Sequence, residues 1–157
     1  MKRSPLWALV LVAACTSGGG GPPPGGGGSD LSGFAIETIT VDGVAIEAWL
    51  AETPAQQAQG FMDATEAQLA DLPDGTPRGM LFVFAAPQPV SFFMRDTFVA
   101  LDLAYIRADG TIAEVHELVP LDETPVPASE PIQFALEVRR GTLAANGLGP
   151  GSVLVIP

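Results

Sequence analysis

Apolar and polar residues alternate along most of the chain after residue 30, a pattern typical of short β-strands with one buried face. The first two such segments, residues 34–40 and 44–50, flank Asp42-Gly43, a dipeptide that favours a tight hairpin turn. A β-hairpin is therefore predicted to open the folded part. Further strand patterns cover residues 80–84, 90–94, 101–106, 111–116, 132–138 and 153–156.

Two short segments predict the starts of helices. Thr53 with Gln56, and Thr65 with Gln68, form capping-box patterns, in which each side chain can bind the other residue's backbone N–H. A third helical turn is expected over residues 142–146, where a glycine follows that can close it.

These elements, about eight short strands and two or three short helices, predict an α+β fold in which β-structure dominates. Residues 80–84 are apolar at every position, which indicates a central strand. Because closure protects strand edges, we expect a small closed or partly closed β-barrel. Pro87 and Pro89 predict a turn or crossover, and the Pro-rich, acidic residues 119–131 predict a long ordered loop or flap.

The first thirty residues differ from this pattern and predict export. Lys2 and Arg3 precede an apolar stretch over residues 6–14, which is too short to span a bilayer and is typical of a secretion signal. The tetrad Val12-Ala13-Ala14-Cys15 resembles the bacterial lipobox, in which cleavage before the cysteine leaves it N-terminal and lipid-modified. An ordinary signal peptide with an incidental Cys15 is the alternative.

We therefore expect a lipoprotein signal peptide (residues 1–14), a lipidated Cys15 with a Gly/Pro-rich tether (15–30) and one globular domain (31–157). Such a protein would be exported and lipid-anchored in the bacterial cell envelope. Thr16 after the cysteine favours the outer membrane, with the domain facing the periplasm. With a single cysteine no intrachain disulfide can form, so the core alone must hold the fold.

The charge of the chain excludes one class of partner. The formal net charge is -11, and loss of Lys2 and Arg3 would leave five Arg against 18 acidic residues, a balance of -13. A surface this acidic repels phosphate backbones, so nucleic acid is not an expected partner. The expected partners are the membrane, through lipidated Cys15, and an unknown small molecule or envelope protein.

The most apolar run, residues 79–103, also contains Arg95, Asp96 and Asp102. Burying a charged group without a partner is costly, so these residues either pair with one another or line a cleft. We expect a ligand-binding cleft at these three residues and Thr97. A soft apolar lining is expected from three methionines, Met62, Met80 and Met94. Ordinary core packing is the alternative for the methionines.

Two interpretations of the charged residues stay open. Asp96 and Asp102 could act as the general acid and base of a hydrolase if their surroundings separate their pKa values. Otherwise Asp102 accepts hydrogen bonds from backbone amides, and Asp96 pairs with Arg95 or caps the bend. The Arg95 guanidinium could grip a ligand carboxylate or phosphate, or form a salt bridge to either aspartate.

Other chemistry has little support in the sequence. His116 is the only histidine and a weak candidate for a metal ligand, because Glu114 and Glu117 flank it but no second histidine or free thiol is available. Solvation beside a hairpin is the alternative for it. No serine-hydrolase elbow, phosphate-binding loop or dinucleotide motif occurs, and no cofactor is expected.

Several short motifs occur in the order found in one known family. They are Gly60-Phe61-Met62, Gly79-Met80-Leu81-Phe82-Val83-Phe84, Ser91-Phe92-Phe93-Met94-Arg95-Asp96-Thr97, Leu101-Asp102, Asp109-Gly110, Leu136-Glu137-Val138 and Asn146-Gly147-Leu148. Over residues 36–156 the chain resembles the domain of unknown function 192 family, which implies a compact, β-rich, often exported domain without an established activity. Asp63, Asp96 and Ser152 depart from the usual family residues, two of them altering charge beside the expected site.

The expected function is that of a non-enzymatic envelope lipoprotein whose cleft binds a small ligand or a partner segment. A hydrolase that uses Asp96 and Asp102 is one alternative, and a purely structural envelope assembly module is another. A catalytic pair would require a carboxyl with a strongly shifted pKa in an open cleft. A structural module would enclose Arg95 completely and show no cleft.

Overall fold

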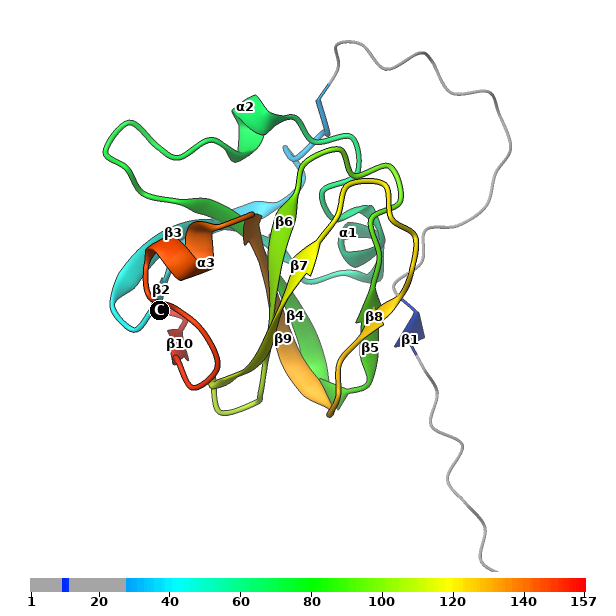
Figure 1. Ribbon diagram of the computed structural model, residues 1–157, viewed down its shortest axis with the longest axis vertical. Helices are drawn as coiled ribbons and strands as arrows, with labels where there is room; N and C mark the ends of the chain where they lie inside the picture. The colour runs from blue at the N-terminus through cyan, green and yellow to red at the C-terminus, as the bar shows by residue number, and fades with distance from the viewer. Residues whose placement is uncertain (1–9, 12–27) are drawn as a thin grey trace, which may run out of the picture.

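The computed structural model describes residues 10–11 and 28–157 (Figure 1). Residues 1–9 and 12–27 lie outside the described residues, and with them Cys15 and most of the predicted signal peptide and tether. No helix in the described part of the chain is both long and apolar enough to cross a membrane.

A seven-stranded sheet forms the body of the domain, with strand order β10-β2-β3-β4-β9-β6-β7. Its strands are β2 (Ala35–Val41), β3 (Val44–Ala51), β4 (Arg78–Gln88), β6 (Leu101–Ile106), β7 (Ile112–Leu118), β9 (Ile132–Arg139) and β10 (Leu154–Val155). Strands β3 and β4 are parallel, and the other neighbours are antiparallel. The predicted opening hairpin is β2–β3, with Asp42 and Gly43 at positive φ in its turn.

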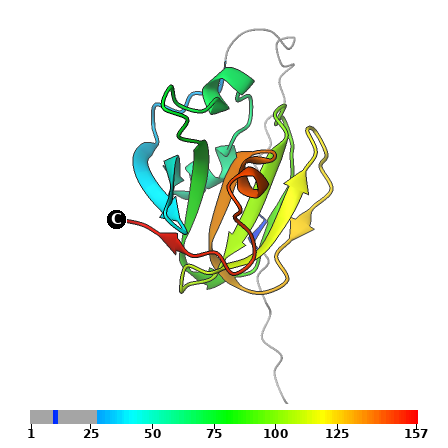
Figure 2. The same ribbon diagram turned by 60° about the vertical axis from the view of Figure 1, so that its left-hand side comes forward.

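The sheet curls until its two edges approach each other (Figures 1 and 2). A single bridge between Thr111, just before β7, and Val153, just before β10, joins them. The backbone N–H of Ile112 also donates to the carbonyl of Ser152 at 2.8 Å. The predicted β-dominant α+β fold with a partly closed barrel is confirmed, and the edge pairing supplies the closure that protects exposed strands.

A small second sheet consists of β1 (Val10–Leu11), β5 (Val90–Phe92) and β8 (Val126–Pro127). Strand β5 lies between the other two, parallel to β1 and antiparallel to β8. Strand β8 lies within residues 119–131, for which the sequence predicted only an ordered loop or flap. This segment therefore folds back onto β5.

Strand β4 is longer than predicted, because it continues through Pro87 to Gln88. Its pairing with β9 breaks after Val83 and resumes only where Gln88 faces Ile132. Pro87 thus lies in the gap, where its missing N–H costs no ladder hydrogen bond.

Three short helices complete the described part: α1 (Pro54–Gln59), α2 (Glu66–Leu69) and α3 (Thr142–Ala145). Both predicted capping boxes are present, at Thr53 for α1 and Thr65 for α2. Helix α1 ends where Gly60 adopts φ 48° and ψ −136°, a conformation that favours glycine.

The sheet separates two apolar cores. The first core lies on the face covered by α1 and β5, and its larger members include Trp49, Phe61, Met80, Phe82, Phe92 and Tyr105. The second core is enclosed by the curled sheet and α3, and it includes Ile46, Leu81, Ile106, Leu136, Leu143 and Leu154. Alternation along each strand therefore decides which core a side chain enters.

Candidate functional site

A small cavity lies where α1 and the loop after it approach the first core. Its volume is about 30 Å³, room for roughly two water molecules. The lining residues come from α1, the turn after it, β4, β5, the bend after β5 and β9: Gln57, Ala58, Gln59, Gly60, Phe61, Met62, Phe82, Phe92, Phe93, Thr97 and Glu137. Phenylalanine rings and one carboxyl thus face the same small space.

Glu137 is the residue that distinguishes this cavity. It lies in β9 between Met80 of β4 and Leu103 of β6, both fully buried. Its neighbours Leu136 and Val138 face the second core, so the Glu137 side chain faces the first. The residue is only 5% exposed, and no hydrogen bond or ion pair joins its carboxyl to another described residue; its oxygens keep some contact with the cavity, unlike the fully enclosed Ser91 Oγ and His116 Nε2.

Burial alone raises the pKa of Glu137 to about 8. The cause is desolvation, because the carboxylate form loses its water and gains no donor or cation in exchange. At neutral pH most of the population therefore carries a neutral carboxyl. A strongly perturbed carboxyl in a cavity is typical of a functional site, since such burial costs stability without any packing benefit.

The polar groups around Glu137 already use their donors elsewhere. The Nε2 amide of Gln57 donates to the carbonyls of Ala51 at 3.3 Å and Val83 at 2.9 Å, which fixes α1 to the sheet. The Nε2 amide of Gln59 donates to Ser29 Oγ at 3.1 Å and the Asp30 carbonyl at 2.8 Å. These bonds hold one wall of the cavity in place.

Thr97 was predicted as a site residue and lines the cavity. It is 5% exposed, and its hydroxyl donates to the Arg95 carbonyl at 3.1 Å. The bend that carries it is also tied down, because the backbone N–H of Leu121 donates to the Thr97 carbonyl at 3.1 Å. Thr97 is therefore a fixed part of the wall.

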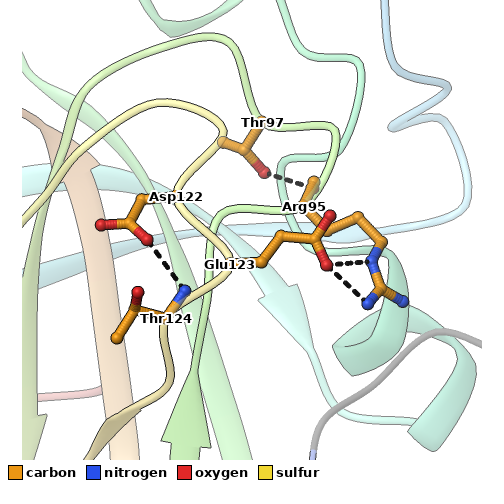
Figure 3. Close-up of polar contacts among 5 residues, drawn as sticks. All are labelled: Arg95, Thr97, Asp122, Glu123 and Thr124. Carbon is orange, nitrogen blue, oxygen red and sulfur yellow. Dashed lines mark hydrogen bonds and ion pairs between the residues drawn. The ribbon is translucent and has the colours of Figure 1, made fainter.

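Arg95 lies beside this wall, and its guanidinium is directed at the Glu123 carboxylate (Figure 3). Its Nε and Nη2 groups both donate to Glu123 Oε2, at 3.0 and 2.7 Å, and its side chain is 42% exposed. The guanidinium also lies over the Phe93 ring, 5.1 Å from the centroid. The sequence predicted a salt bridge from Arg95 to Asp96 or Asp102 as the alternative to ligand binding. That prediction was wrong, because the loop that carries Glu123 folds back over the bend and brings its carboxylate to Arg95.

Asp96 and Asp102 do not meet in a common site. Asp96 is exposed at φ 51° in the bend, where its backbone carbonyl accepts from the Asp63 N–H at 2.8 Å. Asp102 is buried on the side of β6 that faces the second core, and its Oδ2 accepts from the Leu143 N–H at 3.1 Å. Asp102 thus supplies the acceptor at the start of α3, where Gly141 has no side chain to do so.

The three methionines have different positions. Met62 is partly exposed and lines the cavity. Met80 is fully buried beside Glu137, and Met94 is buried in the first core. Met94 and Phe93 also line a second cavity of about 50 Å³ under residues 117–126. Core packing accounts for Met80 and Met94, while Met62 belongs to the candidate site.

His116 is partly buried on β7. Its Nε2 lies 3.3 Å from Glu114 Oε2, and its ring packs edge-on against Tyr105 with centroids 5.7 Å apart. Among the described residues no group of three or more His, Cys, Asp and Glu side chains is arranged to hold a metal ion. His116 therefore lies in a local contact between β6 and β7.

The sequence places Glu137 in the Leu136-Glu137-Val138 motif but does not predict it as a site residue. The signal was available, since Glu137 interrupts the apolar strand pattern of residues 132–138 as Asp102 interrupts that of residues 101–106. The sequence does not show which face of the sheet each of these two side chains occupies. Only the register shows that Glu137 faces a cavity and Asp102 a helix end.

Comparisons with known proteins agree with this fold. A family model described as Uncharacterized ACR, the domain of unknown function 192, matches residues 37–156. A crystal structure of a protein of unknown function from Novosphingobium aromaticivorans DSM 12444 is similar, with 32% identity and a TM-score of 0.70 over 88% of this chain and 99% of that one.

A second crystal structure is similar to the same extent. It is described as a candidate transcription regulator from Sinorhizobium meliloti 1021, with 32% identity and a TM-score of 0.69 over 78% of this chain and 95% of that one. None of the curated proteins compared with this chain matches it.

Proposed function

We propose that this chain, which belongs to the domain of unknown function 192 family, binds a small ligand in the cavity beside α1, with Glu137 as the polar anchor. One observation carries the proposal: a carboxyl that is 5% exposed, lies in a cavity and has no partner within the described residues. A buried polar group normally has a partner, so an unpaired one in a cavity is a place for an external group.

The size of the cavity limits the ligand to a small polar head. A volume of about 30 Å³ is far below that of a site for a complete drug-sized molecule. The remainder of the ligand would extend past the partly exposed Met62 and α1 into solvent. Of the residues predicted for a cleft, Thr97 and Met62 belong to this site, Arg95 and Asp96 flank it, and Asp102 does not.

Proton transfer by Glu137 is a second candidate function. The raised pKa of about 8 favours it, because a carboxyl that is neutral near pH 7 can act as a general acid. However, Glu137 is the one titratable side chain among the described residues that line the cavity. A hydrolase with paired carboxylates, as considered for Asp96 and Asp102, therefore has no support at this site.

The charge distribution supports a small ligand over nucleic acid. Residues 28–157 carry five arginines, and each contacts a carboxylate: Arg78 with Glu47, Arg95 with Glu123, Arg107 with Glu130, Arg139 with Asp71 and Arg140 with Glu117. A basic patch for phosphates is absent from this part of the chain. The described residues therefore give no support for DNA binding by this chain.

We propose a location in the cell envelope as well, with lipid attachment at Cys15. The support is the lipobox-like tetrad and the Gly/Pro-rich segment after it, which lie in the sequence outside the described residues. Metabolic labelling of the expressed chain with a fatty acid, with Cys15→Ser as the control, tests this. Label on the Cys15→Ser variant would contradict the assignment.

A fragment screen by NMR on the full chain tests ligand binding. With methyl-labelled methionine, Met62 reports on the proposed cavity and Met94 on the second one. We expect at least one class of small polar fragment to shift the Met62 methyl signal and leave that of Met94 in place. If fragments shift neither signal, or only Met94, binding beside Glu137 is wrong.

A further inference from the structure

The side chains around Glu137 offer acceptors and no free donors. Both hydrogens of Gln57 Nε2 and both of Gln59 Nε2 are used by backbone or Ser29 oxygens. The Thr97 hydroxyl hydrogen is used by the Arg95 carbonyl. Within the described residues the Oε1 atoms of Gln57 and Gln59 accept no hydrogen bond, so both are still available as acceptors for a ligand.

The apolar part of the cavity also suits a positive charge. The rings of Phe61, Phe82, Phe92 and Phe93 line it, and aromatic faces attract cations. Residues 28–157 offer no free cation of their own, because they contain no lysine and each of their arginines contacts a carboxylate elsewhere. A net negative charge raises the local concentration of cations around the whole domain.

We propose that the group bound beside Glu137 is the primary ammonium head of a small amine. An ammonium carries three donors, no acceptor and one positive charge, which complements a carboxylate and the acceptor oxygens around it. Its size is close to that of a water molecule, which the cavity of about 30 Å³ can hold. This inference rests on the proposed function, whose site it shares.

Binding would release a proton. In the free protein Glu137 is mostly neutral near pH 7, since burial raises its pKa to about 8. When R–NH₃⁺ enters, the carboxyl gives its proton to the solvent and the resulting carboxylate pairs with the ammonium, so charge and atoms balance. The apparent affinity should rise about tenfold per pH unit below the pKa of Glu137 and level off above it.

The experiment compares four probes of similar size on the full chain. Butylammonium is titrated against butanol, butyrate and tetramethylammonium, with the Met62 methyl signal as the readout. We expect butylammonium to bind about 10- to 100-fold more tightly than butanol or butyrate, because a buried charge-assisted contact is worth that much. Tetramethylammonium has the charge but no donors, so it should bind more weakly than butylammonium.

Glu137→Gln removes the charge at nearly constant shape, and Glu123→Gln is the matched control at an exposed carboxylate. We expect Glu137→Gln to lose the preference for butylammonium while butanol binding is unchanged, and Glu123→Gln to behave as wild type. Calorimetry of the wild type in buffers of different ionisation heat measures proton release independently of any variant, and near pH 7 it should approach one proton per amine.

The outcomes separate this inference from the proposed function. If neutral fragments shift Met62 as strongly as butylammonium, or if no proton is released, the ammonium assignment is wrong and ligand binding at the site stands. If butyrate is preferred, the assignment is wrong as well. If no probe or fragment shifts Met62, the proposed function fails and the inference fails with it.

Discussion

Glu137 illustrates how one residue can reveal a site that composition does not. Its cross-strand neighbours Met80 and Leu103 are fully buried, so an apolar side chain at this position would pack in the core without the cost of burying a polar group. A carboxyl there must either stay neutral or meet a cation from outside. The residue therefore costs stability in the free protein above about pH 4.5, where the unfolded chain ionises it and the folded chain does not.

The first prediction concerns the stability of Glu137→Gln as a function of pH. Below about pH 4.5 the carboxyl is protonated in both the folded and the unfolded chain, so the two proteins should have similar stability. Between about 4.5 and 8 the unfolded chain loses this proton and the folded chain keeps it, so wild-type stability falls as pH rises.

Urea unfolding of wild type and Glu137→Gln at several pH values checks this. At about pH 8 the variant should be more stable by on the order of 4 kcal/mol, and at about pH 4 by little or nothing. Glu123→Gln, at an exposed position, should track the wild type. A constant difference across the pH range would mean that Glu137 ionises normally.

The second prediction compares how substitutions at Asp102 and Asp96 change the free energy of unfolding. Asp102→Ala leaves the Leu143 N–H buried without an acceptor at the start of α3, so it should cost about 1 to 3 kcal/mol of unfolding free energy. Asp96→Asn keeps a residue that tolerates positive φ at an exposed bend, so it should change stability by less than about 0.5 kcal/mol. Thermal or urea unfolding measures both, and equal effects would contradict the different roles given to them.

At the scale of elements, α1 forms one wall of the cavity although it is only six residues long. A helix this short has little stability of its own. Its capping box at Thr53 and the two Gln57 contacts with the sheet hold it in place. The order of the cavity wall therefore depends on a few polar contacts.

The third prediction tests this dependence with Thr53→Ala. Loss of the cap should cost about 1 kcal/mol and increase hydrogen exchange at the Gly60 N–H, which bonds to the Gln56 carbonyl at the end of α1. The matched change Thr65→Ala removes the same motif from α2, which does not line the cavity. Faster exchange at Gly60 in the Thr65 variant as well would show that the two helices open together.

Local patterns in the sequence predicted most elements. The turn at Asp42-Gly43 and the capping boxes at Thr53 and Thr65 were confirmed, because each depends on residues close in sequence. Strand β8 was missed, because Val126 and Pro127 form a strand only through pairing with β5. A two-residue element carries no periodicity that could be recognised.

The site was harder to predict than the elements, because it depends on long-range placement. Arg95 was expected to meet Asp96 or Asp102, yet Glu123 lies 28 residues away and reaches it through the fold of the intervening loop. Glu137 and Asp102 both interrupt apolar strands, and the sequence cannot say which face of the sheet each occupies. That choice follows from register, which is set by the whole sheet.

At the scale of the whole molecule, charge pairing leaves the described surface without a free arginine. Five arginines and 18 acidic residues lie in residues 28–157, and each arginine contacts one of the carboxylates. The remaining acids give the domain a negative field that favours cationic over anionic partners.

The fourth prediction follows from this field. The chain should show no binding to duplex DNA in fluorescence anisotropy at about 0.1 M salt, and lowering the salt should not produce it, since counterion release needs unpaired basic residues. A known DNA-binding domain serves as the positive control. Salt-dependent binding in the micromolar range would contradict the absence of a basic surface in residues 28–157.

The two cores of the partly closed barrel each contain one buried acidic residue, and the two residues have different surroundings. The second core is sealed by α3, and its buried carboxylate, Asp102, bonds to the Leu143 backbone. The first core opens toward α1 through a cavity, and its buried carboxyl, Glu137, has no partner in the described part of the chain. The contrast between these two residues underlies the proposed function.

The most direct test is an NMR titration of the Glu137 side-chain carboxyl carbon in the ligand-free full chain. A midpoint near pH 8 is the result that a desolvated and unpaired Glu137 predicts. A midpoint below about 5 would contradict the proposed role of Glu137, because it would show that its carboxylate is well hydrated or paired in the free protein.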